Sequence, residues 1–274
     1  MKIAILGADG SMGRIIAGLA ADDPDIQIVG AFTEPNAPTI GTDIGTLIGK
    51  KLAGAKIEDT TGLDKKIKAC KPDVVIDFTV AKATEENAPI IVKNGIKMVI
   101  GTTGLSQKFL DDFKVLVEKN KASSIIASNM ATGMNLFMKI VGEVASALHG
   151  WDTEIIEAHH NRKKDSPSGS ALNLAEIIAK AWNKKLDDIA KYGRPRGPSP
   201  RAKGVQELGI HSIRAGDIVG DHTVLFAGPG ERIELVHRAH DRSCFATGAI
   251  KAAKFLAASA KDSRLYSMKD VLGI

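Results

Sequence analysis

The residues best suited to chemistry lie in one segment of the chain, Glu157–Ser170, with the sequence EAHHNRKKDSPSGS. Its two adjacent histidines, His159 and His160, can take up or release a proton near neutral pH, because the ordinary pKa of histidine lies there. Lys163 adds a positive charge to the same stretch. A proton donor beside a cation can bind a carboxylate and supply a proton to the molecule that carries it. The segment therefore predicts acid–base chemistry on an anionic substrate.

The end of this segment is expected to begin a helix. Ser168, Gly169 and Ser170 precede an apolar helical pattern, where hydroxyls and free backbone N–H groups can bind an anion. Two alternatives compete with this interpretation. A solvated basic loop ahead of a capped helix has the same composition. A zinc site is disfavoured, because His159 and His160 are neighbours on a predicted strand and point to opposite faces of it.

A second pattern lies at the start of the chain, in the glycine-rich loop Gly7–Gly13 (GADGSMG), which has the spacing G-x-x-G-x-x-G. It follows an apolar strand and opens a helix, so its backbone can approach a pyrophosphate that a side chain would exclude. Glu34 stands roughly 20 residues further on, where an acidic residue can hold the adenosine ribose. The alternatives are a plain strand-to-helix turn and, for Glu34, a solvated loop residue.

Three other strands are expected to end at the same edge of the sheet, where open α/β sheets bind ligands. Gly101–Gly104 (GTTG) combines glycines and hydroxyls, which can admit a flat ring or a carboxamide, although a helix-start turn would also use them. Asp77–Thr79 and Ser128–Met130 end two more strands. Phe78 is equally consistent with a core residue and with a ring that stacks on a cofactor.

The first half of the chain alternates strand-like and helix-like segments, and its strands are unbroken apolar runs. This pattern predicts an α/β, doubly wound parallel sheet covered by helices on both faces. Ser106 is expected to cap the helix 107–119. The predicted strands are 2–6, 26–32, 72–79, 97–100 and 123–127, and the predicted helices are 13–21, 81–94 and 107–119.

The pattern changes after about residue 130 and predicts a second, α+β domain with a mixed open sheet. Its expected strands are 153–159, 208–214, 223–226 and 233–240, its expected helices are 135–148 and 171–182, and 245–258 is a last helix that fits either domain. Lys191–Lys203, rich in Pro, Gly and Arg, is expected to be loop. The polar groups of the stretch 205–223, which ends in RAGDIVGDHT, favour turns and subunit contacts over chemistry. The expected domains are 1–130, 131–240 and 241–274.

Composition narrows the class of protein. The 274 residues carry a formal net charge of +5 and are 44% hydrophobic, so wholesale disorder is excluded. A basic chain can bind nucleic acid, an acidic membrane or a small acidic substrate. No apolar run is long enough for a transmembrane helix or a signal peptide, and two cysteines cannot form a disulfide framework, so we expect a cytoplasmic protein. Gly45–Lys50 (GTLIGK) lacks the spacing of a phosphate-binding P-loop and is expected to be loop.

Together these segments resemble the dihydrodipicolinate reductases of bacterial lysine biosynthesis. EAHHNRKKDSPSGSA is close to a signature of that family, and GADGSMGR, DFT, GTTG and RAGDIVGDHT agree with it in order and spacing. The resemblance implies a Rossmann domain, a substrate-binding and oligomerisation domain, a C-terminal helix that returns to the nucleotide domain, and a homotetramer. It also implies reduction of 4-hydroxy-tetrahydrodipicolinate to tetrahydrodipicolinate with loss of water, using NAD or NADP, with no metal, nucleic acid or membrane as partner.

The resemblance also assigns roles to residues. His159 resembles the family's proton donor and Lys163 its catalytic lysine. The residues that would contact substrate are His160, Lys163, Ser168, Gly169, Ser170 and Thr103. Those that would bind the cofactor are Gly7, Ala8, Asp9, Gly10, Ser11, Met12 and Glu34 at its adenosine half, and Phe78, Gly101, Thr102, Thr103, Ser128, Asn129 and Met130 at its nicotinamide half.

The chain departs from the family pattern at four positions. Ser170 replaces a threonine but keeps the hydroxyl, and Val80 replaces the arginine after DFT. Pro35 and Ser11 stand where arginines are common, and both arginines would favour a 2′-phosphate. Their absence predicts a preference for NADH, although the nearby Arg14 leaves NADPH open.

Two other functions compete with this assignment. A different two-domain reductase acting on another small acid would share the nucleotide domain and differ in the segment 157–170. A basic, NAD-sensing regulator that binds nucleic acid has only the charge of +5 and the loop Lys191–Lys203 in its favour, without a DNA-reading motif.

Overall fold

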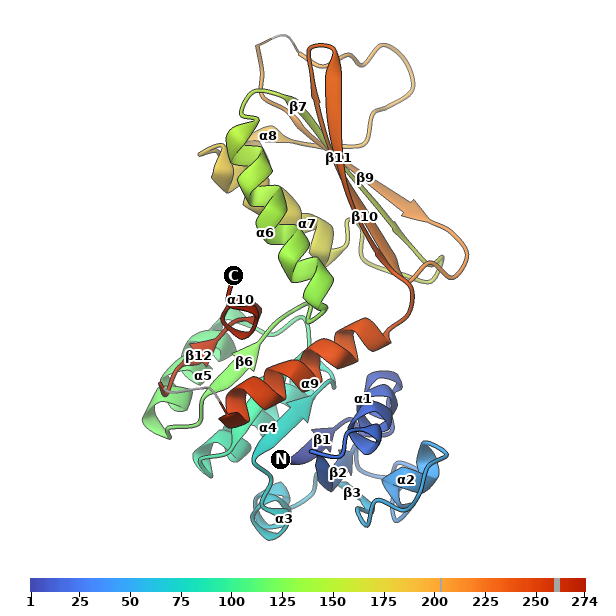
Figure 1. Ribbon diagram of the computed structural model, residues 1–274, viewed down its shortest axis with the longest axis vertical. Coiled ribbons are helices and arrows are strands. Elements are labelled where there is room, and N and C mark those ends of the chain that lie inside the picture. Colours follow the sequence, from blue (N-terminus) through green and yellow to red (C-terminus); the bar gives the residue numbers. More distant parts are fainter. Residues whose placement is uncertain (203, 259–261) are drawn as a thin grey trace. The chain divides into compact units, whose positions relative to one another are not determined.

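The computed structural model describes residues 1–202, 204–258 and 262–274, and the chain divides into two compact units (Figure 1). Met1–Thr132 together with Arg242–Ile274 form the first, which we call the N-terminal unit, and Gly133–Asp241 form the second unit. The last part of the chain therefore belongs to the N-terminal unit. None of the helices in the described part of the chain is long and apolar enough to cross a membrane.

The N-terminal unit contains a seven-stranded sheet with the order β12-β6-β5-β4-β1-β2-β3, and its named strands pair in parallel. The order reverses at β1, which lies between β2 and β4, and the carboxyl ends of the strands at such a point form the usual ligand crevice. The predicted doubly wound parallel sheet is confirmed. Its strands are β1 Lys2–Leu6, β2 Gln27–Thr33, β3 Ile57–Asp59, β4 Val74–Asp77, β5 Lys97–Ile100, β6 Ser124–Ile126 and β12 Leu265–Tyr266.

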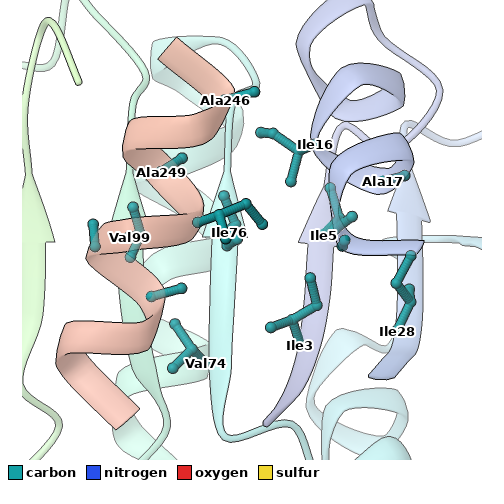
Figure 2. Packing of buried hydrophobic residues seen from close by; sticks show 14 of the residues in the cluster. Ile3, Ile5, Ile16, Ala17, Ile28, Val74, Ile76, Val99, Ala246 and Ala249 are labelled. Carbon is teal, nitrogen blue, oxygen red and sulfur yellow. The ribbon is translucent and has the colours of Figure 1, made fainter. Parts of the chain in front are cut away.

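Helices cover both faces of this sheet, and each face has its own buried cluster. On one face α9 lies along β4 and β5, and the small side chains of Ala246 and Ala249 let it pack closely on Ile76 and Val99 (Figure 2). The other face packs against α3, α4 and α5. The helices of this unit are α1 Ser11–Asp22, α2 Ile44–Leu47, α3 Leu63–Cys70, α4 Ala81–Lys93, α5 Gln107–Lys119, α9 Ser243–Ala258 and α10 Met268–Leu272.

The predicted cap on α5 is confirmed, because the Ser106 hydroxyl accepts the N–H of Phe109. The prediction that Gly45–Lys50 is loop is wrong at its start, where residues 45–47 belong to the short helix α2. Asp43 causes this turn, since its carboxylate accepts the backbone N–H of Gly45 and caps the helix.

The second unit is built on a mixed sheet with the order β11-β10-β7-β9-β8, which confirms the predicted α+β architecture. β10 pairs antiparallel with β7 and β11, whereas β9 pairs parallel with β7 and β8. α7 packs on β7 and β9, and the Trp182 indole at its end donates to Ala145 O of α6. The strands are β7 Asp152–His159, β8 Ala190–Tyr192, β9 Leu208–Arg214, β10 Gly220–Gly228 and β11 Glu231–Ala239, and the helices are α6 Thr132–Ala147, α7 Gly169–Ala181 and α8 Leu186–Ile189.

The prediction that Lys191–Lys203 is entirely loop is wrong at its first two residues. Lys191 and Tyr192 belong to β8, because they pair with Gly209 and Ile210 of β9 at the edge of the sheet. Lys203 lies outside the described residues, so the prediction is not decided there.

Candidate functional site

The glycine-rich loop follows β1 and is tied to the end of β2. The N–H groups of Gly7 and Ala8 donate to Phe32 O over 2.9 and 3.0 Å. Gly7 has a φ of +73°, which favours glycine, and a Cβ on Gly13 would lie only 2.0 Å from Gly7 O. These glycines therefore make the sharp turn and let α1 start directly against the strand. Gly10 is the N-cap of α1 without a side-chain cap, and the first turn carries no acidic residue, which suits an anion.

Hydrogen bonds between side chains hold this loop in place. The Asp9 carboxylate accepts hydrogen bonds from the hydroxyls of Thr33 (2.6 Å) and Thr39 (2.8 Å). Burial favours a higher pKa for Asp9, but these two bonds outweigh it and the pKa is lowered. The Asp9 side chain thus fixes the loop to the end of β2, where Glu34 follows Thr33 and is exposed.

An arginine from the far end of the chain reaches the same loop. Arg242 precedes α9, and its Nη1 donates to the Ser11 hydroxyl over 2.9 Å. No local pattern predicts this contact, because the two residues are 231 positions apart. Met12 is half-buried in the first turn of α1 and packs against the core of the unit.

At the end of β5, the space above Gly101 is taken by an aromatic ring of the protein itself. A Cβ on Gly101 would lie 2.2 Å from the Phe78 ring, so glycine is required for the ring to lie there. Phe78 is half-buried and packs against the core, which fits the core alternative for this residue. The next residue, Thr102, is buried and its hydroxyl bonds Thr79 N (3.1 Å) and Thr84 Oγ1 (2.8 Å). Thr103 is exposed at this edge.

The segment after β6 is held by its own backbone contacts. Asn129 Oδ1 accepts the N–H of Ala131 over 3.0 Å, and Met130 is buried. A Cβ on Gly248 of α9 would lie 1.7 Å from Met130 O, so the helix packs directly on this segment. The structure therefore brings the glycine loop, Glu34, Gly101–Thr103 and Ser128–Met130 to the carboxyl edge of one sheet.

The second unit contains a cluster of buried charge around His159, at the end of β7. His159 Nδ1 lies 2.5 Å from Oε2 of Glu157, which is fully buried two residues earlier on the same face of the strand. Arg214, opposite His159 on β9, donates to both oxygens of Glu157 over 2.9 and 2.8 Å. Burial would raise the pKa of Glu157, but the bonds from Arg214 and His159 hold it at about 2.

His159 is poised as a neutral imidazole in the free protein. Burial lowers its pKa below the ordinary value, and the charges of Lys163 and Arg214 act in the same direction. Glu157 opposes them by stabilising the protonated ring. An anionic ligand next to the ring would add to the effect of Glu157 and favour protonation.

The start of α7 is tied to this cluster. Ser168 N donates to Glu157 Oε1 over 3.1 Å, and its hydroxyl caps the helix by accepting the N–H of Ala171. The same hydroxyl lies 3.2 Å from Nε2 of His222, which is opposite Glu157 on β10. Burial lowers the pKa of His222 to about 4, so this ring is neutral at pH 7. Gly169 is exposed at the helix start and Ser170 is half-buried behind it.

The cationic part of the segment lies in the loop between β7 and α7. Lys163 Nζ is 2.9 Å from Oδ1 of Asp165, and the lysine N–H donates to His160 O. His160 Nδ1 is buried and has no hydrogen-bond partner among the residues that the structure describes. The loop therefore contains both a lysine paired with a carboxylate and a buried imidazole nitrogen without a partner among the described residues. Within the described ranges, no group of three His, Cys, Asp or Glu side chains is arranged to hold a metal ion.

Comparison with known proteins decides the family. The description "Dihydrodipicolinate reductase, N-terminus" matches residues 1–130, and "Dihydrodipicolinate reductase, C-terminus" matches residues 133–272. The chain belongs to the dihydrodipicolinate reductase family. It is accordingly an oxidoreductase, as the resemblance in sequence implies.

Curated relatives match over the whole chain. The 4-hydroxy-tetrahydrodipicolinate reductase of Methanocaldococcus jannaschii is 44% identical over 274 residues, covering 100% of this chain and 98% of the relative. That of Methanothermobacter thermautotrophicus is 40% identical, with 100% and 99% covered.

Solved structures agree in fold. A dipicolinate-bound dihydrodipicolinate reductase from Paenisporosarcina sp. TG-14 is 26% identical, with a TM-score of 0.76 and 97% of both chains covered. An amine dehydrogenase from Mycobacterium smegmatis shares the fold at 15% identity, with a TM-score of 0.62 over 97% of this chain and 96% of that one.

Four residues of the site were not assigned roles from the sequence: Glu157, Asp165, Arg214 and His222. Glu157 and Asp165 lie inside the segment Glu157–Ser170. Each is an acidic residue two positions from a catalytic candidate, and this spacing could have indicated a role for them. Arg214 and His222 lie in the stretch 205–223, for which turns and subunit contacts are the expectation. Both residues lie on strands instead of turns, and the pairing of β9 and β10 with β7 brings them to Glu157 and Ser168.

Proposed function

We propose that the chain reduces 4-hydroxy-tetrahydrodipicolinate to tetrahydrodipicolinate with loss of water, with NADH or NADPH as reductant, in the diaminopimelate route to lysine. The observation that carries the proposal is the His159 cluster, a buried imidazole at the start of a basic, helix-capped loop. The names of the full-length relatives support the substrate, as does the dipicolinate bound to the reductase from Paenisporosarcina.

The residues of the N-terminal unit fit a dinucleotide. A Cβ would fill the glycine loop at Gly7 and Gly13, and α1 offers uncapped N–H groups at Gly10. The loop Gly7–Met12 would hold the pyrophosphate, Glu34 the adenosine ribose, and the edge formed by Gly101–Thr103 and Ser128–Met130 the nicotinamide. When bound, the reduced nicotinamide would supply a hydride to the substrate.

The residues of the second unit supply the proton and hold the substrate. Reduction places electron density on the ring nitrogen of the heterocycle, which must then be protonated, and the imidazole of His159 donates this proton. Glu157 stabilises the charged ring before transfer. The dianionic substrate raises the pKa of His159 toward the working pH, so the acid is charged mainly when substrate is bound.

Substrate carboxylates replace existing partners of the loop. Lys163 exchanges the Asp165 carboxylate for that of the substrate, and His160 gains a partner for its buried nitrogen. The N–H of Gly169 exchanges its Asp165 partner for the substrate in the same way, and Ser170 lies beside it at the start of α7. Ser168 is less available, because its N–H and hydroxyl already bond Glu157, Ala171 and His222, and Thr103 approaches the substrate from the nicotinamide edge.

The coenzyme preference follows from the exposed edge near Glu34. A carboxylate there accepts bonds from the two ribose hydroxyls and repels a 2′-phosphate. Pro35 supplies no compensating charge, whereas Arg242 and Arg14 stand at the glycine loop. We therefore propose that NADH is preferred, with NADPH accepted.

The assembly is a homotetramer in this proposal. The sheet face opposite His159 carries Ile213 of β9 and Val236 of β11, which are 47% and 45% exposed. Exposed apolar side chains on two strands of one sheet face suit burial against another copy. Light scattering at several concentrations tests the assembly: a mass of four chains supports it, and a persistent monomer contradicts it.

A coupled assay tests the reaction. The substrate is generated from pyruvate and aspartate semialdehyde, and nicotinamide absorbance is followed after the protein is added. Oxidation of the nucleotide that requires both precursors supports the proposal. No oxidation with either nucleotide, or equal rates with unrelated 2-oxo acids and ammonia, contradicts it.

A further inference from the structure

The most deeply buried neighbour of His159 is Glu157, whose contacts bear on more than the charge of the ring. Glu157 has no exposed surface, and its two oxygens accept bonds from His159 Nδ1, Ser168 N and both Nη atoms of Arg214, with the Ser212 side chain as a further partner. A carboxylate without partners in such a place would be very costly, so these contacts keep it charged. Arg214 also donates to Asp165 O over 2.7 Å, which links the clamp to the loop that carries Lys163.

The charge state of Glu157 fixes the protonation pattern of the imidazole. An ionised carboxylate only accepts hydrogen bonds, so Nδ1 of His159 must carry a hydrogen to pair with it. The other nitrogen, Nε2, is then the atom that gains and loses a proton. A Cβ built on Gly220 would lie 3.1 Å from Nε2, so the absence of a side chain there leaves this nitrogen room.

We propose that Glu157, clamped by Arg214, is a positioning residue that fixes the Nδ1–H tautomer of His159 and leaves Nε2 as the proton donor. The proposal deepens the proposed function and rests on it for its kinetic consequence. Glu157 does not touch the substrate in this account. It acts only through the ring that it orients and whose charged form it stabilises.

The kinetic test replaces Glu157 by glutamine. Glutamine has nearly the same size and shape as glutamate, but its NH2 group takes the place of one of the two oxygens that accept hydrogen bonds. We expect Glu157→Gln to lower kcat by about 10²-fold, as for loss of a general acid, with the KM for nucleotide and the Kd for pyridine-2,6-dicarboxylate changed less than about threefold. Glu176→Gln is the matched control, because Glu176 is exposed on α7 in the same unit. Near-normal kcat in Glu157→Gln would overturn the proposal.

A double-variant cycle separates positioning from general damage. His159→Asn and Glu157→Gln should be strongly non-additive, so that the double variant is no slower than about twice the His159→Asn variant alone. Additive losses would show that Glu157 acts independently of His159 and contradict the proposal. Arg214→Met should lower kcat in the same direction, because Glu157 loses its clamp.

A spectroscopic test needs no turnover, and its readout is taken on the wild-type protein. Nitrogen-15 NMR of histidine-labelled wild-type protein at alkaline pH, with His159 assigned by comparison with His159→Asn, should show Nδ1 protonated and Nε2 bare. The opposite tautomer would refute the proposal. The correct tautomer in a protein without reductase activity would leave the positioning intact and reject the proposed reaction, so the two failures are distinguishable.

Discussion

The carboxyl edge of the N-terminal sheet consists mainly of backbone atoms, whereas the His159 cluster of the second unit consists of polar side chains. At the sheet edge, the surfaces suited to a ligand are backbone and glycine, and the polar side chains of Asp9 and Thr102 are used to tie strands together. Around His159, titratable side chains contact one another across three strands. A site made of backbone atoms can fit a ligand closely and attract an anion through its N–H groups. The side-chain cluster instead provides a titratable group, His159, whose neighbours adjust its pKa.

The largest effect should come from the imidazole itself. His159→Ala removes the proposed proton donor and should lower kcat by about 10²-fold or more, which is the range for general acids. Nucleotide affinity should stay within about twofold, because the proposed dinucleotide contacts lie in the N-terminal unit. Steady-state kinetics and fluorescence titration with NADH measure the two quantities. A parallel loss of nucleotide affinity would show that the two regions do not have the separate roles assigned to them.

Substitutions in the glycine loop Gly7–Gly13 should instead lower stability and nucleotide binding through a steric clash. Gly13→Ala places a Cβ 2.0 Å from Gly7 O, so we expect a loss of about 3 kcal/mol in the free energy of unfolding and weaker NADH binding. Gly18→Ala is the control on the same helix, because no atom lies within 4 Å of its Cβ. It should stabilise the protein by about 0.5–1 kcal/mol, and urea unfolding compares the two. Equal stabilities would contradict the close approach of α1 to the loop.

The buried histidine cluster should make the second unit sensitive to acid. The folded pKa of His222 is about 4 against 6.5 for the ordinary ring, so the unfolded chain binds the proton first as the pH falls. Stability is therefore lost between pH 6.5 and 4, by about 2–3 kcal/mol from this group. Between pH 7 and pH 4, the free energy of unfolding of His222→Gln should fall by about 2–3 kcal/mol less than that of wild type, as measured by urea unfolding. A variant with the same pH dependence as wild type would show that His222 titrates normally.

The smallest expected change concerns the coenzyme. Pro35→Arg should raise kcat/KM for NADPH by about tenfold and leave that for NADH within a factor of about three, because guanidinium pairs well with phosphate. Pro38→Arg carries the same charge in the same exposed loop and serves as control. A wild-type protein that already prefers NADPH in initial rates would contradict the preference derived from Pro35 and Ser11.

The fold was predictable where its causes are local. The Ser106 cap, the strand-to-helix turn at Gly7–Gly13 and the apolar strands of the parallel sheet depend on neighbouring residues or on simple periodicity. The start of α2 was missed because a single capping residue, Asp43, decides it. β8 was missed because its three residues are strand only through pairing with β9.

The site was predictable only to the extent that it lies in contiguous motifs. His159, Lys163 and the start of α7 belong to one segment, and its resemblance to a family signature gave their roles. Arg214 and His222 reach Glu157 and Ser168 through the pairing of β9 and β10 with β7, and no local pattern encodes that register. Arg242 likewise reaches Ser11 only through tertiary packing.

The most direct test is a crystal structure of the protein soaked with NADH and pyridine-2,6-dicarboxylate. Hydride and proton must reach the same molecule, so the account predicts a dicarboxylate ring that contacts the imidazole of His159 with Nε2 toward it and lies against C4 of the nicotinamide. Lys163 should have exchanged Asp165 for a ligand carboxylate. A ring bound beyond reach of His159, with the nucleotide in place, would contradict the assignment of His159 as the proton donor.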